Sequence, residues 1–287
     1  MTGRFVNKTV IVTGASSGIG AAAAQCFAQE GARVVLAART ERTLQAVAAA
    51  IDADRRLVVP TDVADLEDAA SLLAEAERRF GRIHVLVNNA GFNARGPIEE
   101  QSLDDLTRMV DVNLRAPVAL CRLVLPYLRR AGGGAIVNVA SLSGRIPVAH
   151  AATYCATKFG LRAFSLSLSE ELRGSGITVS VVSPGPVSTE FFLGGIDLVP
   201  DAVFSVTMVE PEEVAACILA CAHDGRPERT IPYLSRYLTT AGYVLPGPRR
   251  ALKPLLDWIG RRNKERIRKT RANPSPGGTD HGQGSDV

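Results

Sequence analysis

Residues 13–20 read Thr13-Gly14-Ala15-Ser16-Ser17-Gly18-Ile19-Gly20, between a β-branched run at 8–13 and a helical pattern that begins at residue 19. Glycine at such a turn lets the backbone reverse sharply and approach a pyrophosphate, whose charge is met by free N–H groups and the positive end of the helix. The spacing G-x-x-x-G-x-G differs from the six-residue dinucleotide fingerprint and lacks the Gly-Lys-Ser/Thr ending of a Walker loop. An ordinary tight strand-to-helix connection is the alternative. Because the turn follows the first strand directly, we favour a nucleotide site.

On both sides of this turn, short β-branched runs alternate with longer helical patterns, which is typical of βαβ units and a parallel sheet covered on both faces. Strands are predicted at 8–13, 33–37, 56–60, 83–88, 134–140, 177–183 and 229–233, and helices at 19–30, 41–51, 65–80, 103–130, 151–173 and 212–222. We therefore predict an α/β fold: a single-domain doubly wound (Rossmann) sheet of seven parallel strands with helices on both faces, plus a basic C-terminal helix. Its ligand crevice should lie at the carboxyl ends of the strands.

The length of 287 residues, with 46% hydrophobic residues, suffices for one large domain. We expect this domain to span 1–245, followed by a basic amphipathic extension at 246–272 and a disordered tail at 273–287. The sequence has no apolar run of about eighteen residues, and its first strand leaves no room for a cleaved signal, so a cytoplasmic protein is predicted. Five scattered cysteines indicate reduced thiols, and no metal site is expected because Cys217 and Cys221 have only His223 nearby.

The positive charge is concentrated near the C-terminus. Residues 249–271 hold ten basic and two acidic side chains, a net of +8, so the rest of this +4 chain is net −4. Leu252, Leu255, Leu256 and Ile259 repeat at helical spacing within that segment. Such a helix is suited to docking on the body or in a dimer contact, to an acidic partner, or to peripheral contact with an anionic membrane. Nucleic acid is disfavoured because no aromatic residues interleave the charge.

The end of the second predicted strand bears on cofactor choice. An NAD-preferring site offers an acidic residue there, whereas this chain has Ala38 and then Arg39. Because arginine can hold a 2′-phosphate bidentately, NADP(H) is favoured over NAD(H); a solvated surface arginine is the alternative. Asp62, after the third strand, can accept a hydrogen bond from an adenine amino group or cap the next helix, and the two roles are compatible.

Tyr154 and Lys158 stand four residues apart in a segment of helical composition, so both side chains project from one face. A phenol has a reference pKa near ~10 and is a poor base at neutral pH unless a neighbouring cation favours its ionised form. Lys158 is placed to be that cation. Taken alone, the pair is more typical of a half-solvated helix face.

A family resemblance strengthens the catalytic interpretation. Over roughly residues 5–230 the chain resembles the short-chain dehydrogenase/reductase family in the order and spacing of its motifs, including the thirteen-residue step from Ser141 to Tyr154. These motifs are the glycine turn, Asn88-Asn89-Ala90-Gly91, Asn113, Ser141, Tyr154, Lys158 and Ser183-Pro184-Gly185.

The resemblance implies hydride transfer between a carbonyl and an alcohol. Tyr154 would be the general acid/base, and Lys158 would lower its pKa and donate to the nicotinamide ribose. Ser141 would hydrogen-bond the substrate carbonyl oxygen, and Asn113 would hold a water that connects Lys158 to bulk solvent. A helix-cap serine and a capping or kink-forming asparagine are the alternatives. The candidate cofactor-binding residues are Gly14, Ser16, Ser17, Gly18, Ile19, Gly20, Arg39, Asp62, Val63, Asn89, Ala90, Gly91, Tyr154, Lys158, Pro184, Gly185, Val187 and Thr189.

Two departures from the family pattern stand out. His84 replaces the aspartate that usually begins the fourth-strand motif, for which we expect only altered local packing or capping. The segment 229–233 lacks the glycine-rich ending of typical tetrameric members, which leaves dimer or tetramer open for the expected homo-oligomer.

Between Pro184 and Pro211 an apolar substrate-covering segment favours a lipophilic small molecule, or else packs as a lid on its own core. The sequence therefore predicts an NADP(H)-dependent oxidoreductase acting on a lipophilic ketone, aldehyde or alcohol. The alternative is a catalytically silent dinucleotide-binding scaffold or sensor.

Overall fold

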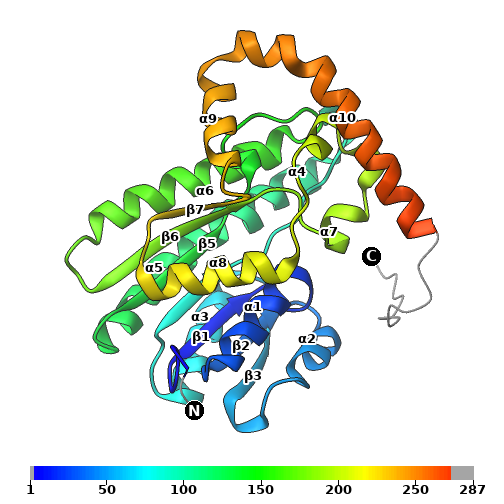
Figure 1. Ribbon diagram of the computed structural model, residues 1–287. Helices are drawn as coiled ribbons and strands as arrows, with labels where there is room; N and C mark the ends of the chain where they lie inside the picture. The colour runs from blue at the N-terminus through cyan, green and yellow to red at the C-terminus, as the bar shows by residue number, and fades with distance from the viewer. Residues whose placement is uncertain (1–2, 273–287) are drawn as a thin grey trace.

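The computed structural model describes residues 3–272. The expected disordered tail at 273–287 lies outside these residues. Seven parallel strands form one sheet in the order β3-β2-β1-β4-β5-β6-β7 (Figure 1). The strands are β1 (Thr9–Thr13), β2 (Arg33–Ala38), β3 (Arg56–Pro60), β4 (Val85–Asn88), β5 (Gly134–Val139), β6 (Ile177–Pro184) and β7 (Glu228–Ile231). The predicted doubly wound sheet is confirmed, and its order reverses between β1 and β4, where such folds bind ligands.

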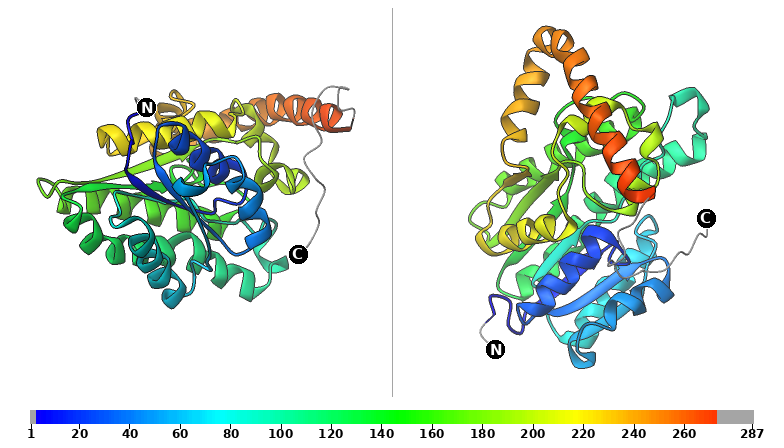
Figure 2. Two further views of the ribbon diagram at one scale, coloured as in Figure 1. Left: turned by 90° about the horizontal axis from the view of Figure 1, so that it is seen from below. Right: turned by 45° about the vertical axis from the view of Figure 1, so that its right-hand side comes forward.

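Helices cover both faces of the sheet (Figure 2). One face carries α1 (Gly18–Gln29), α2 (Glu41–Ala48) and α8 (Pro211–Asp224), and the other carries α3 (Leu66–Phe80), α5 (Ala116–Arg130) and α6 (Ala152–Glu171). Alternate strand residues serve the two cores: Val10 and Val12 pack with α1 and α8, whereas Ile11 between them packs with α3 and α5. The near-continuous apolar composition of the strands follows from burial on both faces.

The predicted helix at 103–130 is interrupted. It consists of α4 (Leu103–Val110), a π-helical turn (Asp111–Arg115) and α5, which follows directly. Composition alone gives no sign of this change in hydrogen bonding, because Asp111–Arg115 has the side chains of an ordinary helix. The turn buries Asn113, for which the family resemblance implies a catalytic role.

His84, which stands before β4, accepts a hydrogen bond at Nδ1 from the backbone N–H of Thr9 at 3.0 Å. Burial, together with the charges of Lys8, Arg82 and Arg33, lowers the pKa of His84 to about 4. The imidazole is therefore neutral at pH 7, and it serves as a hydrogen-bond acceptor that ties the start of β4 to β1. The departure from the family pattern is thus a local structural contact, as expected.

Beyond β7 the chain forms a helical hairpin of α9 (Ser235–Val244) and α10 (Pro246–Ala272). The sequence predicts a basic helix in the region of α10, whereas α9 was not anticipated. The turn between the two helices projects from the body, and α10 then runs back across the region of α7 (Glu190–Leu193) (Figures 1 and 2). Among the described helices, none combines the length and apolar character needed to cross a membrane.

Candidate active site

A cleft of about 1930 Å³ opens at the carboxyl ends of the strands. It is lined by the glycine turn, the end of β2, the loop after β4, Ser141, the start of α6 and the segment after β6. All predicted site residues line this cleft except Gly20 and Asn113, which are buried behind it. Residues as far apart in the chain as Gly14 and Thr189 therefore converge on one site, as the sequence predicts.

The glycine turn has a geometry that suits a pyrophosphate. Gly14 and Gly18 have φ values of +64° and +52°, and a Cβ atom on Gly20 would lie 2.1 Å from the carbonyl oxygen of Gly14. Asn89 braces the turn, because its Nδ2 donates to the carbonyl oxygens of Thr13 and Gly14 at 3.0 and 3.2 Å. The N-cap residue of α1 makes no side-chain capping hydrogen bond, so the first N–H groups of the helix have no such partner. An anion fits this cradle.

The adenosine side of the cleft contains Arg39 and Asp62. Arg39 is exposed at the end of β2, and within residues 3–272 it has no hydrogen bond or ion pair. Asp62 accepts a hydrogen bond from Arg108 at 2.6 Å and another from the N–H of Ala64 at 3.1 Å. Burial opposes ionisation of Asp62, but the contacts with Arg108 prevail and lower its pKa. The capping role falls to Asp65 instead, whose side chain accepts from the first turn of α3.

Asn113 positions the chain beside Lys158. Its Nδ2 donates to the carbonyl oxygen of Phe92 at 2.8 Å, and its Oδ1 accepts from the N–H of Phe92 at 3.0 Å. A Cβ atom on Gly91 would lie 2.9 Å from Oδ1 of Asn113 and 3.5 Å from Nζ of Lys158. Only glycine therefore fits comfortably between them. The kink-forming interpretation describes this asparagine well, and its role in holding a water stays a prediction.

Tyr154 and Lys158 lie on the inner side of α6, with only 8% and 4% of their surfaces exposed. Nζ of Lys158 donates to the carbonyl oxygen of Val139 at 2.9 Å and lies 5.7 Å from the centre of the Tyr154 ring. Burial raises the pKa of Tyr154 to about 12, although a hydrogen bond with Ser141 and the charge of Arg95 oppose the rise. Burial also lowers the pKa of Lys158 to about 8. At pH 7 the site thus holds a neutral phenol beside an ammonium group.

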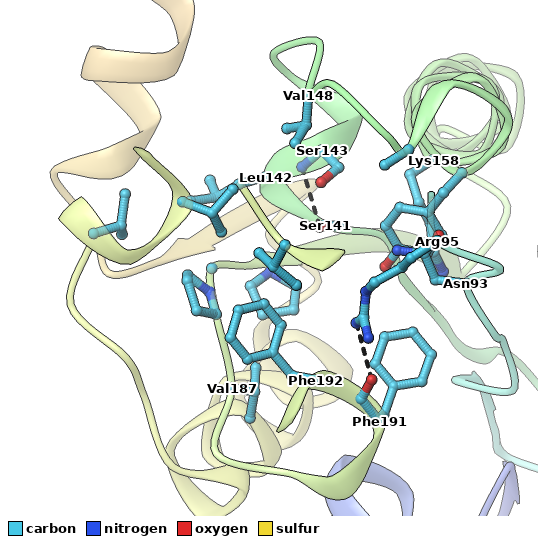
Figure 3. Close-up of a pocket in the computed structure, with 18 of the residues that line it drawn as sticks. Asn93, Arg95, Ser141, Leu142, Ser143, Val148, Lys158, Val187, Phe191 and Phe192 are labelled. Atoms are coloured by element: carbon cyan, nitrogen blue, oxygen red, sulfur yellow. Dashed lines mark hydrogen bonds between the residues drawn. The ribbon is translucent and has the colours of Figure 1, made fainter. Parts of the chain in front are cut away.

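Ser141 lies at the end of β5 and caps a short 3₁₀ turn, since its Oγ accepts from the N–H of Ser143 at 3.1 Å (Figure 3). The same hydroxyl is near enough to the phenol of Tyr154 to act against the rise in its pKa. The capping and catalytic interpretations are therefore compatible, because the capping bond uses a lone pair of Oγ and the O–H remains a donor.

Arg95 is a site residue that no sequence pattern indicated. It follows β4 and donates to the carbonyl oxygen of Phe191 at 2.9 Å (Figure 3). Its guanidinium lies 5.6 and 5.7 Å from the ring centres of Phe191 and Phe192. Partial burial lowers the pKa of Arg95, while the proximity of Tyr154 acts in the opposite direction. A second cation therefore faces the phenol, from the loop after β4.

Comparison with known proteins identifies the family to which the chain belongs. A profile of the short chain dehydrogenase family matches residues 8–193. The chain belongs to this family.

An uncharacterised oxidoreductase of Staphylococcus aureus is 33% identical over 218 residues, which make up 75% of this chain and 90% of the relative. A D-threitol dehydrogenase of Mycolicibacterium smegmatis is 36% identical over 233 residues, 77% of this chain and 88% of the relative. The crystal structure of 3-ketoacyl-(acyl-carrier-protein) reductase from Brucella melitensis complexed with NADH has a TM-score of 0.73 at 26% identity, covering 79% of this chain and 97% of that one. This short-chain dehydrogenase is therefore an NAD(P)-dependent oxidoreductase.

The C-terminal half of α10 in this short-chain dehydrogenase packs on the segment that covers the cleft, here called the lid (residues 186–210). Lys264 is only 6% exposed, and its Nζ donates to the carbonyl oxygen of Val199 at 2.8 Å. Asn263 donates to the carbonyl oxygen of Phe204 at 2.9 Å. Two outer ion pairs, Arg261 with Asp201 and Arg268 with Asp197, join the same elements. Docking on the body, one of the alternatives for this basic helix, thus applies to residues 260–268.

A close backbone contact explains why this helix carries a glycine. A Cβ atom on Gly260 would lie 1.8 Å from the carbonyl oxygen of Asp201, so no other residue allows so close an approach without a shift. The pairing of a basic helix with two lid aspartates could not be found from spacing, because the partners are some 60 residues apart.

Proposed function

We propose that this protein is an NADP(H)-dependent oxidoreductase that interconverts a ketone or aldehyde and an alcohol by hydride transfer, on a lipophilic substrate. The observation that carries the proposal is that half-buried Ser141 and buried Tyr154 and Lys158 line the same cleft as the glycine turn. The nicotinamide supplies or accepts the hydride when the cofactor is bound. The residues of this chain manage the proton and hold the reacting groups.

In the reductive direction, the neutral phenol of Tyr154 donates its proton to the carbonyl oxygen as the carbonyl carbon receives the hydride. The hydroxyl of Ser141 hydrogen-bonds that oxygen, and the ammonium of Lys158 stabilises the phenolate left behind. In the oxidative direction the phenolate takes the proton back. Asn113 supports this arrangement by fixing Gly91 and Phe92 beside Lys158, and we retain its predicted role of holding a water.

The preference for NADP(H) is supported by Arg39, an exposed cation at the cleft end of β2, a strand that ends in Ala38 rather than in an acidic residue. Arg39→Ala should weaken NADPH binding about tenfold to a hundredfold, the range expected for losing a charge-assisted bidentate contact, and should change NADH binding little. Titration of each cofactor by fluorescence measures this. Arg122→Ala, an exposed arginine outside the cleft, is the matched control. Equal losses for NADPH and NADH would refute the phosphate role.

The lipophilic substrate is supported by the lid side of the cleft, where Phe191, Phe192, Leu198 and Val199 form much of the lining. A panel of methyl ketones of increasing chain length, assayed with NADPH and with NADH, tests the function as a whole. Each methylene that enters an apolar pocket should raise kcat/KM about fourfold, which corresponds to ~0.8 kcal/mol. Tight cofactor binding without turnover of any carbonyl would favour the alternative, a catalytically silent scaffold or sensor.

The remaining parts of the proposal concern assembly and location. We propose a cytoplasmic homo-oligomer, either a dimer or a tetramer, in peripheral contact with an anionic membrane. The contact was expected through residues 249–271, but residues 260–268 pack on the lid. The membrane contact therefore has to involve a more N-terminal part of the extension. Light scattering after size-exclusion chromatography gives the oligomeric state.

A further inference from the structure

Exposed apolar side chains gather on the helical hairpin. Of the sixteen large hydrophobic side chains that are exposed among the described residues, ten lie between residues 233 and 258. They belong to the turn after β7, to α9 and to the first half of α10, which together we call the hairpin surface. They are Tyr233, Leu234, Tyr237, Leu238, Tyr243, Val244, Leu245, Leu252, Leu255 and Trp258. An apolar concentration of this size marks an interaction site rather than ordinary surface variation.

The hairpin surface is also basic. Residues 233–258 contain four basic side chains and one acidic side chain, a net charge of +3. The single acidic residue, Asp257, pairs with Lys253 at 2.6 Å. Two arginines lie against exposed aromatic rings: Arg262 is 4.9 Å from the ring centre of Trp258, and Arg236 is 6.0 Å from that of Tyr237. Apolar and cationic groups thus alternate on the same part of the molecule.

The hairpin is held firmly at its base, so its apolar side chains are exposed on an anchored element. The buried Arg145 donates to the hydroxyl oxygens of Thr239 and Thr240 at 3.3 and 2.8 Å and also pairs with Glu228. Arg249 donates to the carbonyl oxygen of Pro147 at 2.7 Å. The body therefore contacts α9 through these threonines and through Tyr243, whose ring centre lies 5.6 Å from that of Phe159. Leu234, Tyr237 and Leu238 stay exposed.

The substrate cleft reaches the hairpin surface. Leu234, Leu238, Leu245 and Leu252 are each more than half exposed, yet they line the same cleft as Tyr154. An apolar wall consequently runs from the region of the catalytic tyrosine to the exposed face of the hairpin. Figure 1 shows this hairpin projecting beyond the rest of the fold.

We propose that the hairpin surface binds an anionic phospholipid membrane, with its apolar side chains in the interface, its basic side chains at the headgroups and the cleft open toward the lipid. Direct access of a substrate from the lipid to the cleft rests on the proposed oxidoreductase function. Binding of the hairpin surface to the membrane does not. Helices with leucine, tryptophan and arginine in this combination lie in membrane interfaces. Each basic residue gains from the negative surface potential there.

A second copy of this chain is the competing occupant, and charge argues against it. An isologous contact places the same patch on both subunits, so a two-fold contact through the hairpin surface would bring two net charges of +3 together. An anionic membrane offers the opposite charge over the whole patch. The electrostatics therefore favour the lipid surface.

Trp258 makes the proposal directly measurable, because it is the single tryptophan of the chain and is 55% exposed. The full-length protein is titrated with vesicles of phosphatidylglycerol and phosphatidylcholine, and with vesicles of phosphatidylcholine alone. We expect a blue shift of the emission, protection from iodide quenching and co-sedimentation with the anionic vesicles, all weakened by high salt. Unchanged emission together with protein that stays in the supernatant would overturn the proposal.

Matched variants locate the contact. Leu234→Ser combined with Leu238→Ser should abolish most of the binding, whereas Leu103→Ser, an equally exposed leucine on α4, should leave it intact. Arg250→Ala combined with Arg262→Ala should weaken binding about thirtyfold, because each lost charge should cost about fivefold. Equal losses in the Leu103→Ser control would overturn the assignment to the hairpin.

The outcomes separate this proposal from the others. Retained NADPH binding confirms that each variant is folded. A blue shift that follows protein concentration without vesicles, together with a mass that doubles over the same concentrations and stays constant in the Leu234→Ser and Leu238→Ser double variant, would replace the membrane with a second copy. Carbonyl reduction without vesicle binding would overturn only the membrane contact, and vesicle binding without any reduction would overturn only the proposed oxidoreductase activity.

Discussion

The burial of Lys158 predicts the pH at which carbonyl reduction fails. With 4% of its surface exposed and a hydrogen bond to the carbonyl oxygen of Val139, this lysine has its pKa lowered by burial to about 8. Burial raises the pKa of Tyr154 to about 12. Raising the pH from 6 to 10 therefore leaves the phenol protonated but removes the charge of the ammonium. The group that limits the reaction in this range should be the lysine.

The sign and size of the effect follow from these pKa values. If only the enzyme with charged Lys158 stabilises the phenolate formed on proton transfer, kcat/KM should be constant below about pH 7 and fall tenfold per pH unit above about pH 8. At pH 10, two units above the pKa, the loss should be about a hundredfold, or ~2.7 kcal/mol.

The assay is the reductive kcat/KM for NADPH between pH 6 and 10, since this ratio reports ionisations of the cofactor-free enzyme. Circular dichroism at each pH checks that the protein stays folded. Lys158→Arg keeps its charge throughout the range, so whatever activity it retains should lack the inflection near pH 8. Tyr154→Phe gives the background without the proton donor. A wild-type profile without an inflection between pH 7 and 9, or the same inflection in Lys158→Arg, would refute the assignment.

Three further predictions concern parts outside the proton-transfer pair. The pKa of His84 is lowered from its ordinary value of 6.5 to about 4 in the folded protein. The free energy of unfolding should therefore be fully present above pH 6.5. It should fall by about 1–2 kcal/mol toward pH 4, a range that allows for the partial exposure of the imidazole. Urea unfolding of His84→Asp should lack this fall, and an equal fall would contradict the account. Lys264→Met should release the lid and raise KM for the carbonyl several-fold, while the affinity for NADPH stays unchanged. The control Lys269→Met, at an exposed lysine, should leave this KM unchanged. A loss of cofactor binding in Lys264→Met would point to misfolding instead. Gly20→Ala, whose Cβ would meet a carbonyl oxygen at 2.1 Å, should weaken cofactor binding more than tenfold, while Gly247→Ala, with open space, should be neutral; equal titration curves would count against the glycine cradle.

The sequence was sufficient for the sheet because each strand and the turn after β1 are specified locally. Strand β1 is buried on both faces, so its five residues are all apolar or β-branched, and the glycines after it have backbone angles that favour glycine. The break between α4 and α5 was not predictable. It coincides with the contact of Asn113 with the backbone of Phe92, 21 residues away, which no local pattern records.

The site residues also divide into those that a local motif predicts and those that only tertiary contacts reveal. Ser141, Tyr154 and Lys158 could be named because a motif fixes their spacing within one loop and one helix. Arg108 and Lys264 could not, because they meet partners that lie 46 and 65 residues away in the chain. Both are cations that hold another part of the site, Asp62 in one case and the lid in the other. Their importance follows from tertiary contacts alone.

These contacts join the C-terminal extension to the electrostatics of the tyrosine. Lys264 holds the lid at the carbonyl oxygen of Val199, and the lid in turn offers the carbonyl oxygen of Phe191 to Arg95. Arg95 is one of the two influences that oppose the rise in the pKa of Tyr154. A lid displaced from α10 would remove the partner that orients this guanidinium, so the phenol would lose part of its cationic environment. Helix α10 therefore contributes to the proton donor through two intermediate contacts, although none of its own residues contacts the tyrosine in the described structure.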